Sequence, residues 1–200
     1  KSLQSSLTQR SSFRLMILVR EATPEDVAQL HQMINELAEY EKAPEEVIAT
    51  EHNLMKALFG RDFSSPEFDQ HDSIAASGSA NTPHGQPALY AFVVEDPEDP
   101  NQLAGMAIWF LNYSTWDGTH GVYLEDLYVR PQFRGQGMGK ALMKRLAQVC
   151  VDNDYSRFQW WVLDWNQPAI EVYRAMGAKA MDEWTVYRVS GQELKDLASE

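Results

Sequence analysis

The apolar positions after residue 15 follow two different periods. Val27, Leu30, Ile34 and Leu37 recur every three or four residues and predict one face of a helix that starts after Thr23. Further helices are expected over 50–58, 137–151 and 166–176, and after residue 190. Runs rich in β-branched and aromatic residues predict strands at 16–20, 88–95, 102–112, 122–129, 157–163 and 180–189.

The order of these elements indicates the fold class. Three of the strands follow one another through short turns, and the later strands alternate with helices. Hairpin-linked strands followed by alternating strands and helices give a mixed sheet with helices on its faces. We therefore expect an α/β (α+β) fold, a mixed central sheet flanked by helices.

Two segments do not fit this pattern. Residues 1–15 are rich in Ser and Gln and carry only basic charges, so we interpret them as a disordered tail or a remnant of targeting or cloning. Residues 60–87 are rich in Ser, Gly, Pro and Asp, which predicts a mobile surface excursion. The rest of the chain, 16–200, is long enough for one domain with a proper core.

Composition narrows the class of partner. The formal net charge is −12, which argues against nucleic acid and favours a small cationic substrate. No apolar run approaches the roughly 20 residues that span a bilayer, so no membrane partner is expected. The single cysteine, Cys150, excludes an intramolecular disulfide and fits a reducing compartment. We expect a cytoplasmic protein, with organellar import through residues 1–15 left open.

The segment from Glu125 to Lys140 carries the clearest chemical signal. An apolar run ends at Pro131, glycines follow at 135, 137 and 139, and a helical pattern then begins. Glycines allow close approach of the backbone, and the first helical turn has unpaired N–H groups, so this order predicts a phosphate site. A P-loop is excluded because Ala141 occupies the position where that motif has Ser or Thr. A dinucleotide-binding fingerprint is excluded because Lys140 occupies the position of its last glycine. A turn without a ligand is the alternative.

A resemblance to a known family rests on this loop. Arg134, Gly137 and Gly139 form an Arg-x-x-Gly-x-Gly pattern that resembles the pyrophosphate loop of the GCN5-related N-acetyltransferases (GNATs). Segments 36–41, 123–129, 163–169 and 173–178 are similar to the diamine (spermidine/spermine) acetyltransferase group, above all to its thialysine N-ε-acetyltransferase branch. The resemblance implies the GNAT acyl-CoA N-acyltransferase fold, acetyl-CoA as co-substrate, no metal, and a homodimer.

Two residues are candidates for catalysis. Acetyl transfer needs a neutral amine, and deprotonating an alkylammonium of pKa about 10.4 at pH 7 costs about 4–5 kcal/mol. Glu125 is the expected base, because apolar neighbours on its strand predict burial and a raised pKa; a structural carboxylate is the alternative. Asp126, on the opposite face by strand alternation, is interpreted as a packing or solvent residue. The resemblance makes Tyr173 the acid that protonates the leaving thiolate, whereas helical periodicity alone predicts core packing.

The coenzyme is expected to bind mainly through the backbone. Pantetheine can add to a strand as a peptide does, and the diphosphate is expected on the glycine loop. Asn166 either hydrogen-bonds the coenzyme or simply caps a helix. The predicted coenzyme-binding residues are Leu127, Tyr128, Val129, Arg134, Gly135, Gln136, Gly137, Met138, Gly139, Lys140, Asn166, Gln167, Pro168 and Ala169.

The resemblance also implies the substrate-binding residues, Tyr40, Glu41, Trp116 and Glu125. An aromatic face and a carboxylate suit an ammonium group, although Tyr40 and Glu41 also fit an ordinary exposed helix end. The polyamine enzymes have an aspartate where this chain has Ser114, and one carboxylate fewer weakens recognition of a distant second cation.

Together these features predict an acetyl-CoA-dependent N-acetyltransferase. Its acceptor would be a small primary amine, such as thialysine, a lysine analogue or a diamine, which attacks directly in a ternary complex. One alternative is a protein lysine or N-terminal acetyltransferase. The alternative from another class is a non-catalytic acetyl-CoA-binding module.

Overall fold

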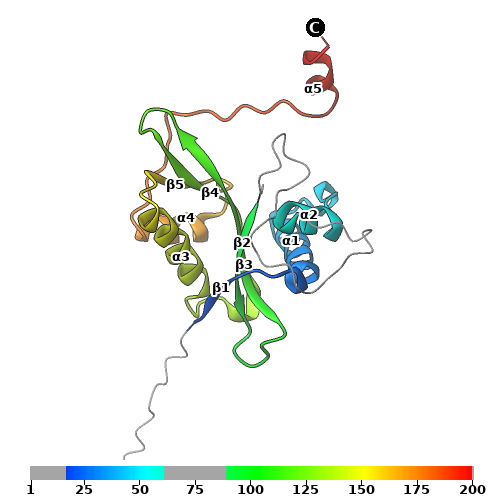
Figure 1. Ribbon diagram of the computed structural model, residues 1–200, viewed down its shortest axis with the longest axis vertical. Coiled ribbons are helices and arrows are strands. Elements are labelled where there is room, and N and C mark those ends of the chain that lie inside the picture. The colour runs from blue at the N-terminus through cyan, green and yellow to red at the C-terminus, as the bar shows by residue number, and fades with distance from the viewer. Residues whose placement is uncertain (1–16, 61–88, 200) are drawn as a thin grey trace, which may run out of the picture. The chain divides into compact units, whose positions relative to one another are not determined.

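A computed structural model of the chain describes residues 17–60 and 89–199 (Figure 1). The described residues fall into two compact units, divided between Trp161 and Val162. In the first unit the elements are β1 (Val19–Glu21), η1 (Pro24–Asp26), α1 (Val27–Glu41), η2 (Pro44–Glu46), α2 (Glu51–Phe59), β2 (Tyr90–Glu95), β3 (Leu103–Ser114), β4 (Thr119–Val129), η3 (Pro131–Phe133), α3 (Met138–Asp152) and β5 (Arg157–Trp160). The second unit contains α4 (Gln167–Ala175) and α5 (Gly191–Leu197).

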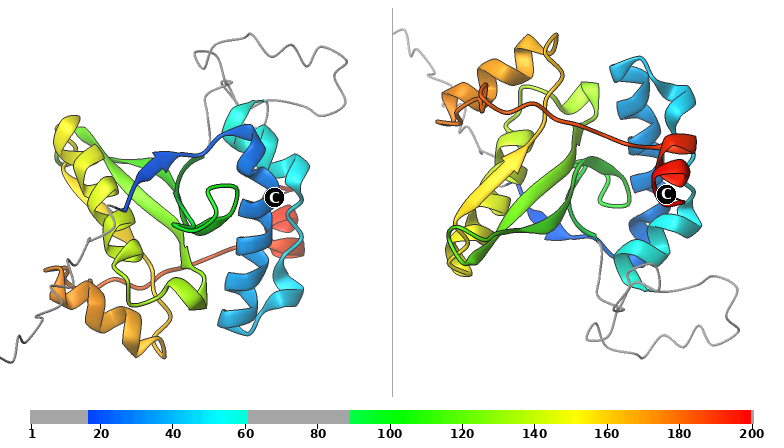
Figure 2. Two further views of the ribbon diagram at one scale, coloured as in Figure 1. Left: turned by 90° about the horizontal axis from the view of Figure 1, so that it is seen from below. Right: turned by 90° about the horizontal axis from the view of Figure 1, so that it is seen from above.

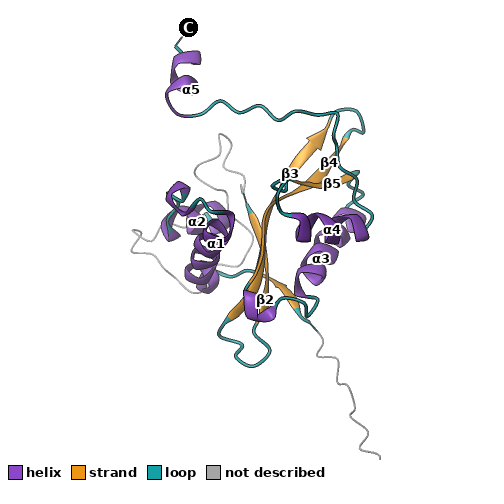
Figure 3. Cartoon of the chain, turned by 180° about the vertical axis from the view of Figure 1, so that it is seen from behind, coloured by secondary structure: helices purple, strands orange, loops and turns teal. Residues whose placement is uncertain are grey.

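The strands of the first unit form one mixed sheet in the order β1-β2-β3-β4-β5 (Figure 3). Neighbouring strands are antiparallel except β4 and β5, which are parallel. A parallel pair requires a crossover connection, and α3 supplies it. The predicted mixed sheet and α/β class are confirmed.

Helices cover both faces of this sheet (Figure 2). On one face, α1 and α2 pack over apolar residues of β2 and β3, with Leu30, Met33, Met106 and Ile108 almost fully buried at the centre. Burying a side chain of this size contributes about 1.5–3 kcal/mol, so this layer fixes α1 against the sheet.

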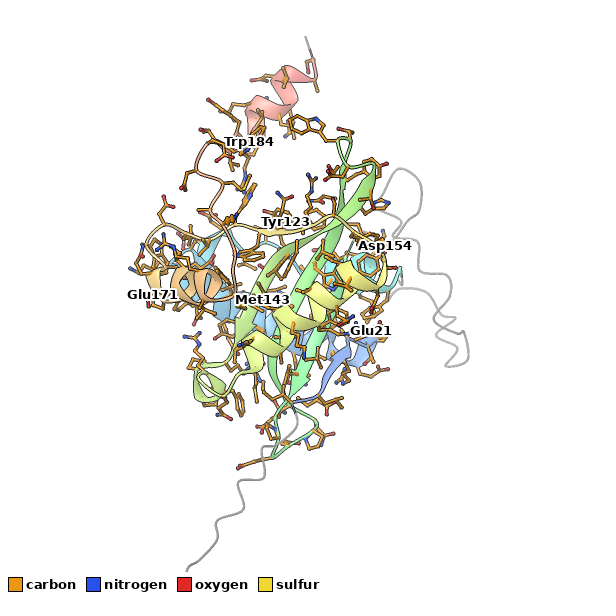
Figure 4. The ribbon with its side chains drawn as sticks, turned by 90° about the vertical axis from the view of Figure 1, so that its left-hand side faces the viewer. Glu21, Tyr123, Met143, Asp154, Glu171 and Trp184 are labelled. Carbon is orange, nitrogen blue, oxygen red and sulfur yellow. The ribbon has the colours of Figure 1, made fainter. Side chains whose placement is uncertain are left out.

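The other face is covered by α3, on which Met143 lies (Figure 4). Leu142, Met143 and Leu146 recur at helical spacing and are buried. Cys150, one turn further on, is also buried, and burial raises the pKa of its thiol. The thiol is therefore an apolar packing group rather than a nucleophile.

Charged side chains fix the beginning of α1. Arg20 on β1 donates to Asp26 at 2.7 and 3.0 Å and to Glu95 on β2 at 2.6 Å. Asp26 also accepts a hydrogen bond from the Thr23 N–H at 2.7 Å, so the predicted Thr23 start is confirmed, with η1 as its first turn. Burial alone would raise the pKa of Asp26, but the bonds from Arg20 and Thr23 outweigh it and lower that pKa.

The second unit differs from expectation in one respect. The helix predicted at 166–176 is confirmed as α4, with Gly177 at φ +88° just beyond it. The strand predicted at 180–189 is wrong, because those residues are irregular and exposed. Alternating apolar residues show that a segment suits a pleated, half-buried surface, but they do not supply the neighbouring strand that its N–H and C=O groups need.

Two predicted segments, 1–15 and 60–87, lie outside the described residues, except for Gly60, which ends α2 in the left-handed conformation. Within the described ranges, no helix combines the length and apolar character required to cross a bilayer.

Candidate active site

A β-bulge in β4 organises the candidate site. Ile108 of β3 pairs with Asp126, and the next residue, Trp109, pairs with Leu124. Glu125 is therefore the extra residue on β4 and has no partner of its own in this ladder. Bulges bend a strand and redirect side chains, and they are common beside active sites.

The bulge also changes which face the side chains of β4 occupy. Asp126 shares the side of Ile108, which lies in the core under α1 and α2. Leu124 shares the side of Trp109, whose ring stacks with that of Phe92 at 5.7 Å. The Phe92 ring in turn contacts the α3 side, because the guanidinium carbon of Arg145 lies 4.8 Å from its centre. Leu124 and Asp126 thus project to opposite faces, although they are two positions apart.

The structure contradicts the predicted burial of Glu125. Its side chain is exposed rather than buried, whereas Asp126 is partly buried. Burial is the largest of the causes that raise the pKa of Asp126 to about 6, and the negative charges of Glu125 and Glu41 contribute to the same rise. The carboxyl with the strongly raised pKa is therefore Asp126, which the sequence pattern had led us to interpret as a packing or solvent residue. The bulge, which alternation cannot reveal, is the reason.

The last turn of α1 lies beside this carboxyl pair. Glu41 ends α1 and is close enough to Asp126 to influence its pKa, and partial burial raises the pKa of Glu41 itself. Two carboxylates, Glu125 and Glu41, thus act electrostatically on Asp126. Like charges nearby favour the protonated form of a carboxyl group.

Beyond the bulge, β4 has an open edge. The Arg130 N–H donates to the Ala104 carbonyl of β3 at 2.9 Å. Since main-chain groups alternate in direction along an antiparallel strand, those of Leu127 and Val129 point away from β3. On that side the ladder with β5 ends at Leu124 and Trp160, so no strand of the described sheet pairs with Leu127 or Val129 there.

The glycine loop follows this edge directly. Gly135 and Gly137 have φ values of +75° and +91°, which side chains rarely adopt, and Gly137 is the N-cap of the 15-residue helix α3. Ala141 donates to the Gly137 carbonyl, so the N–H groups of the first turn before it have no acceptor within the helix. The positive end of a helix dipole and N–H groups of this kind attract anions.

The Arg134 side chain does not point along the loop. Its Nε donates to the Val129 carbonyl at 2.9 Å. Its guanidinium carbon lies 5.0 Å from the centre of the Tyr40 ring and 5.6 Å from that of Tyr128. Arg134 thus links the glycine loop to α1.

A cavity of about 630 Å³ lies between α1 and the end of β4. It is lined by Gln32, Glu36, Glu39, Tyr40, Tyr128, Arg130, Pro131, Gln132 and Arg134. At its base Arg130 forms an ion pair with Glu36 at 3.2 Å and donates to the Leu103 carbonyl at 2.9 Å. Burial raises the pKa of Tyr128, and the Glu36 carboxylate raises it further. Glu36 and Arg130 were not predicted as site residues, because residues 94 positions apart give no local signal of pairing.

The remaining predicted residues lie in the turn between β3 and β4 and in the second unit. Trp116 is 92% exposed in the turn between β3 and β4. Seven strand residues separate this turn from Asp126, about 23 Å of extended chain, so the structure does not bring Trp116 to the carboxyl pair. In the second unit, Asn166 is the N-cap of α4 but its side chain makes no capping bond. Gln167, Pro168 and Ala169 form the first turn of α4, and Tyr173 is half-buried on it.

Within residues 17–60 and 89–199, no group of three or more His, Cys, Asp or Glu side chains is arranged to hold a metal ion.

Comparison with known proteins identifies a matching family and similar sequences. The sequence model of the acetyltransferase (GNAT) family matches residues 50–178. A thialysine N-epsilon-acetyltransferase of Sus scrofa is 34% identical over 187 residues, which cover 91% of this chain and 97% of the relative. An L-ornithine N5-acetyltransferase of Arabidopsis thaliana is 32% identical over 211 residues, covering 95% and 91% of the two chains.

Solved structures show the same fold. An integron cassette protein from the mobile metagenome of V. cholerae has a TM-score of 0.65 at 22% identity and covers 92% of this chain and 98% of its own. An aminoglycoside acetyltransferase from an uncultured soil sample has a TM-score of 0.62 at 16% identity, with 87% and 95% covered. At these identities the likeness concerns the fold alone.

Proposed function

Because the chain belongs to the acetyltransferase (GNAT) family, we propose that it transfers the acetyl group of acetyl-CoA to a small primary amine. The candidate acceptors are thialysine, ornithine, lysine analogues and diamines. The observation that carries the proposal is the order along β4: a carboxyl pair at the bulge, an open main-chain edge, and a helix N-terminus behind a glycine loop.

The residues present fit a coenzyme A diphosphate. A Cβ placed on Gly135 would meet no atom within 4 Å, and Gly137 holds a backbone conformation that favours glycine. The N–H groups at the start of α3 and the Lys140 ammonium supply positive charge for the diphosphate. Leu127 and Val129 supply donors and acceptors for an extended pantetheine, as they would for an added strand. The coenzyme supplies an activated thioester.

The carboxyl pair at the bulge, Glu125 and Asp126, removes the proton of the acceptor ammonium ion. The amine arrives as an ammonium ion, and its deprotonation costs about 4–5 kcal/mol at pH 7. A base is most effective when its pKa lies near the working pH, and the Asp126 pKa of about 6 meets this condition. The exposed Glu125 lies next to Asp126 in the chain, and its negative charge contributes to the raised pKa of Asp126. We assign proton removal to this pair, with Asp126 as the acceptor of the proton.

The roles assigned to Tyr173 and to residues 166–169 follow from the family resemblance. Tyr173 donates a proton to the leaving thiolate, whose conjugate acid has a pKa of about 8.5. Residues 166–169 contribute to coenzyme binding through the first turn of α4. The amine attacks directly in a ternary complex, because the one cysteine is buried and unsuited to form an acyl-enzyme.

The cationic substrate is attracted by the acidic chain. A net charge of −12 steers an ammonium ion, and Tyr40 and Glu41 at the end of α1 offer an aromatic ring and a carboxylate. A homodimer and a cytoplasmic location complete the proposal. Sedimentation equilibrium tests the first, and imaging of the tagged full chain tests the second.

A thiol-release assay tests the proposed reaction. Purified protein, acetyl-CoA and a panel of small amines should give one free thiol per acetylated amine, and calorimetry should detect acetyl-CoA binding. Activity on peptides alone would indicate a protein acetyltransferase. Binding of acetyl-CoA without transfer to any amine or peptide would indicate a non-catalytic binding module.

A further inference from the structure

Arg130 carries a buried guanidinium group that its surroundings satisfy only in part. The residue follows β4 directly and is 9% exposed. Its Nε donates to Glu36 on α1 at 3.2 Å, and its Nη1 donates to the Leu103 carbonyl of β3 at 2.9 Å. Its Nη2 is buried and has no hydrogen-bond partner among the residues that the structure describes. A buried N–H group without an acceptor destabilises a fold, so stability alone does not account for a guanidinium group at this position.

The ion pair between Arg130 and Glu36 is also a poor source of stability. The two side chains are 10% and 25% exposed, so both charges have lost most of their water. The cost of removing two charges from water offsets their attraction, and apolar residues of similar volume often stabilise a fold equally well or better. Leu30 and Met33, which are fully buried, already fix α1 on the sheet. What the ion pair adds is a defined position for the groups that it joins.

The pair holds the end of β4 from two directions. Arg130 bonds to β3 through both its main-chain N–H and its side chain. Glu36 ties Arg130 to α1 and also interacts with the buried Tyr128, whose pKa it raises. Tyr128 and Arg130 are the two neighbours of Val129 in the chain. One carboxylate of α1 therefore acts on both sides of Val129.

Val129 lies at the strand edge that is proposed to hold the coenzyme. Its carbonyl accepts a hydrogen bond from Arg134 Nε at 2.9 Å. Its side chain lies against the start of α3, where a Cβ placed on Gly139 would be 3.7 Å from the Val129 Cγ2. Main-chain groups that present a thioester must be placed accurately, because an error of about 1 Å can cost about 10²-fold in rate. The main chain at Val129 therefore needs firm support from its neighbours.

The same ion pair also fixes this strand against the acceptor side of the site. Glu36 and Tyr40 are four positions apart on α1, so they share a face of the helix, and both line the cavity between α1 and β4. Tyr40 and Glu41 are the α1 residues proposed to meet the acceptor. A link from Glu36 to Arg130 thus connects the helix proposed to contact the amine with the strand proposed to contact the thioester.

We propose that Glu36 and Arg130 are positioning residues, which hold the β4 main chain around Val129 in the place that acetyl transfer requires. Neither side chain touches the reacting atoms. Glu36 acts through Arg130 and Tyr128, and Arg130 acts through the main chain of its neighbour. This inference rests on the proposed function, because it concerns the strand edge of that same site. It gives the contact between α1 and β4 a role in kcat rather than in stability.

An apolar double variant separates position from stability. Glu36→Leu combined with Arg130→Met removes both charges and the hydrogen bonds between α1 and β4, with side chains of similar volume. Its melting temperature should stay within about 5 °C of that of the wild type. Its kcat for an amine should fall by about 10- to 100-fold. Its Kd for acetyl-CoA, which depends largely on the glycine loop, should change by less than about threefold.

Glu36→Gln should give the opposite result. The amide oxygen can still accept from Arg130, so β4 keeps its position and kcat should stay within about threefold of the wild type. The guanidinium group loses its counter-charge, so the melting temperature should fall by about 5 °C or more. Glu95→Gln is the matched control, because it removes the carboxylate of the Arg20–Glu95 ion pair between β1 and β2 and should leave kcat unchanged. Circular dichroism checks the folding of every variant.

Each other result decides against the positioning role or the proposed function. Wild-type kcat in the folded double variant would show that the pair is a structural contact only. Equal losses of kcat in Glu36→Gln and in the double variant would show that charge, not position, matters. A double variant that does not fold would disprove the premise that the pair contributes little stability. Absence of thiol release by the wild-type protein with every amine of the panel would instead overturn the proposed function.

Discussion

Glu125 and Asp126 are consecutive in β4, and yet one is exposed and the other lies against the core under α1 and α2. The bulge separates them by giving Glu125 no partner on β3. The two carboxyl groups thereby have different surroundings, and burial of Asp126 raises its pKa.

The pH dependence of activity should follow Asp126. In the wild-type protein kcat/KM for an amine should rise with pH through about 6, as Asp126 loses its proton. Asp126→Asn should lower kcat by about 10²- to 10⁴-fold and abolish that step in the residual activity. Glu125→Gln should keep it. Loss of the step in Glu125→Gln alone would return the role of base to Glu125.

Asp126→Asn should stabilise the fold at neutral pH. The pKa of Asp126 is raised from 3.8 to about 6, so the folded state binds the proton more tightly than the unfolded state, and stability falls as pH rises through this window. Asp126→Asn removes the buried charge and should gain up to about 3 kcal/mol at pH 7 and nothing below pH 4. Urea unfolding at both pH values measures this. Glu125→Gln, at an exposed position, should change stability by less than about 0.5 kcal/mol.

The contribution of Asp26 to stability should depend on pH in the opposite direction to that of Asp126. Its hydrogen bonds from Arg20 and Thr23 lower its pKa, so it contributes stability above its unfolded pKa and loses it as pH falls through its folded value. Asp26→Asn should therefore destabilise the protein by about 1–3 kcal/mol at pH 7 and by less in acid. Thermal melts across pH 3 to 7 test this. An equal loss at every pH would show that packing, not charge, stabilises this position.

The glycine loop can be tested with a pair of glycines. Gly137 at φ +91° begins α3, and Gly118 at φ +70° lies in the turn between β3 and β4. Either glycine replaced by Ala incurs a backbone cost of about 1–2 kcal/mol. Only Gly137→Ala should also weaken acetyl-CoA binding, by about tenfold, as measured by calorimetry. Equal affinities in the two variants would place the diphosphate elsewhere.

Tyr173 should affect turnover rather than coenzyme affinity. Tyr173→Phe removes the phenolic proton and keeps the ring, so kcat should fall by about 10²-fold or more while the Kd for acetyl-CoA stays within about twofold. Tyr187→Phe, an exposed position outside α4, serves as control. Unchanged turnover in Tyr173→Phe would remove the role of acid from this residue.

The sequence predicted the parts of the fold that depend on local order. The apolar period after Thr23, the helix after Gly137 and the strand before the glycine loop are all present, because capping residues, glycines and repeating apolar positions act within a few residues. The glycine loop carried the family resemblance for the same reason.

The remaining features depend on distant pairings. The bulge exists only in the register between β3 and β4, and the Arg130–Glu36 ion pair joins residues far apart in the chain. The segment 180–189 has the composition of a strand, but pairing needs a neighbour that composition does not specify. The raised pKa of Asp126 was not predicted, because it depends on burial beside the bulge, which strand alternation does not reveal.

The unpaired residue in β4 divides the strand into two halves of opposite phase. Consider two substitutions in β4, one before Glu125 and one after it, an even number of positions apart. They alter different layers of the protein. Anyone redesigning this acceptor site must therefore count positions separately on each side of residue 125, and a deletion that erased the irregularity would exchange inner and outer side chains along the half of the strand that carries the chemistry.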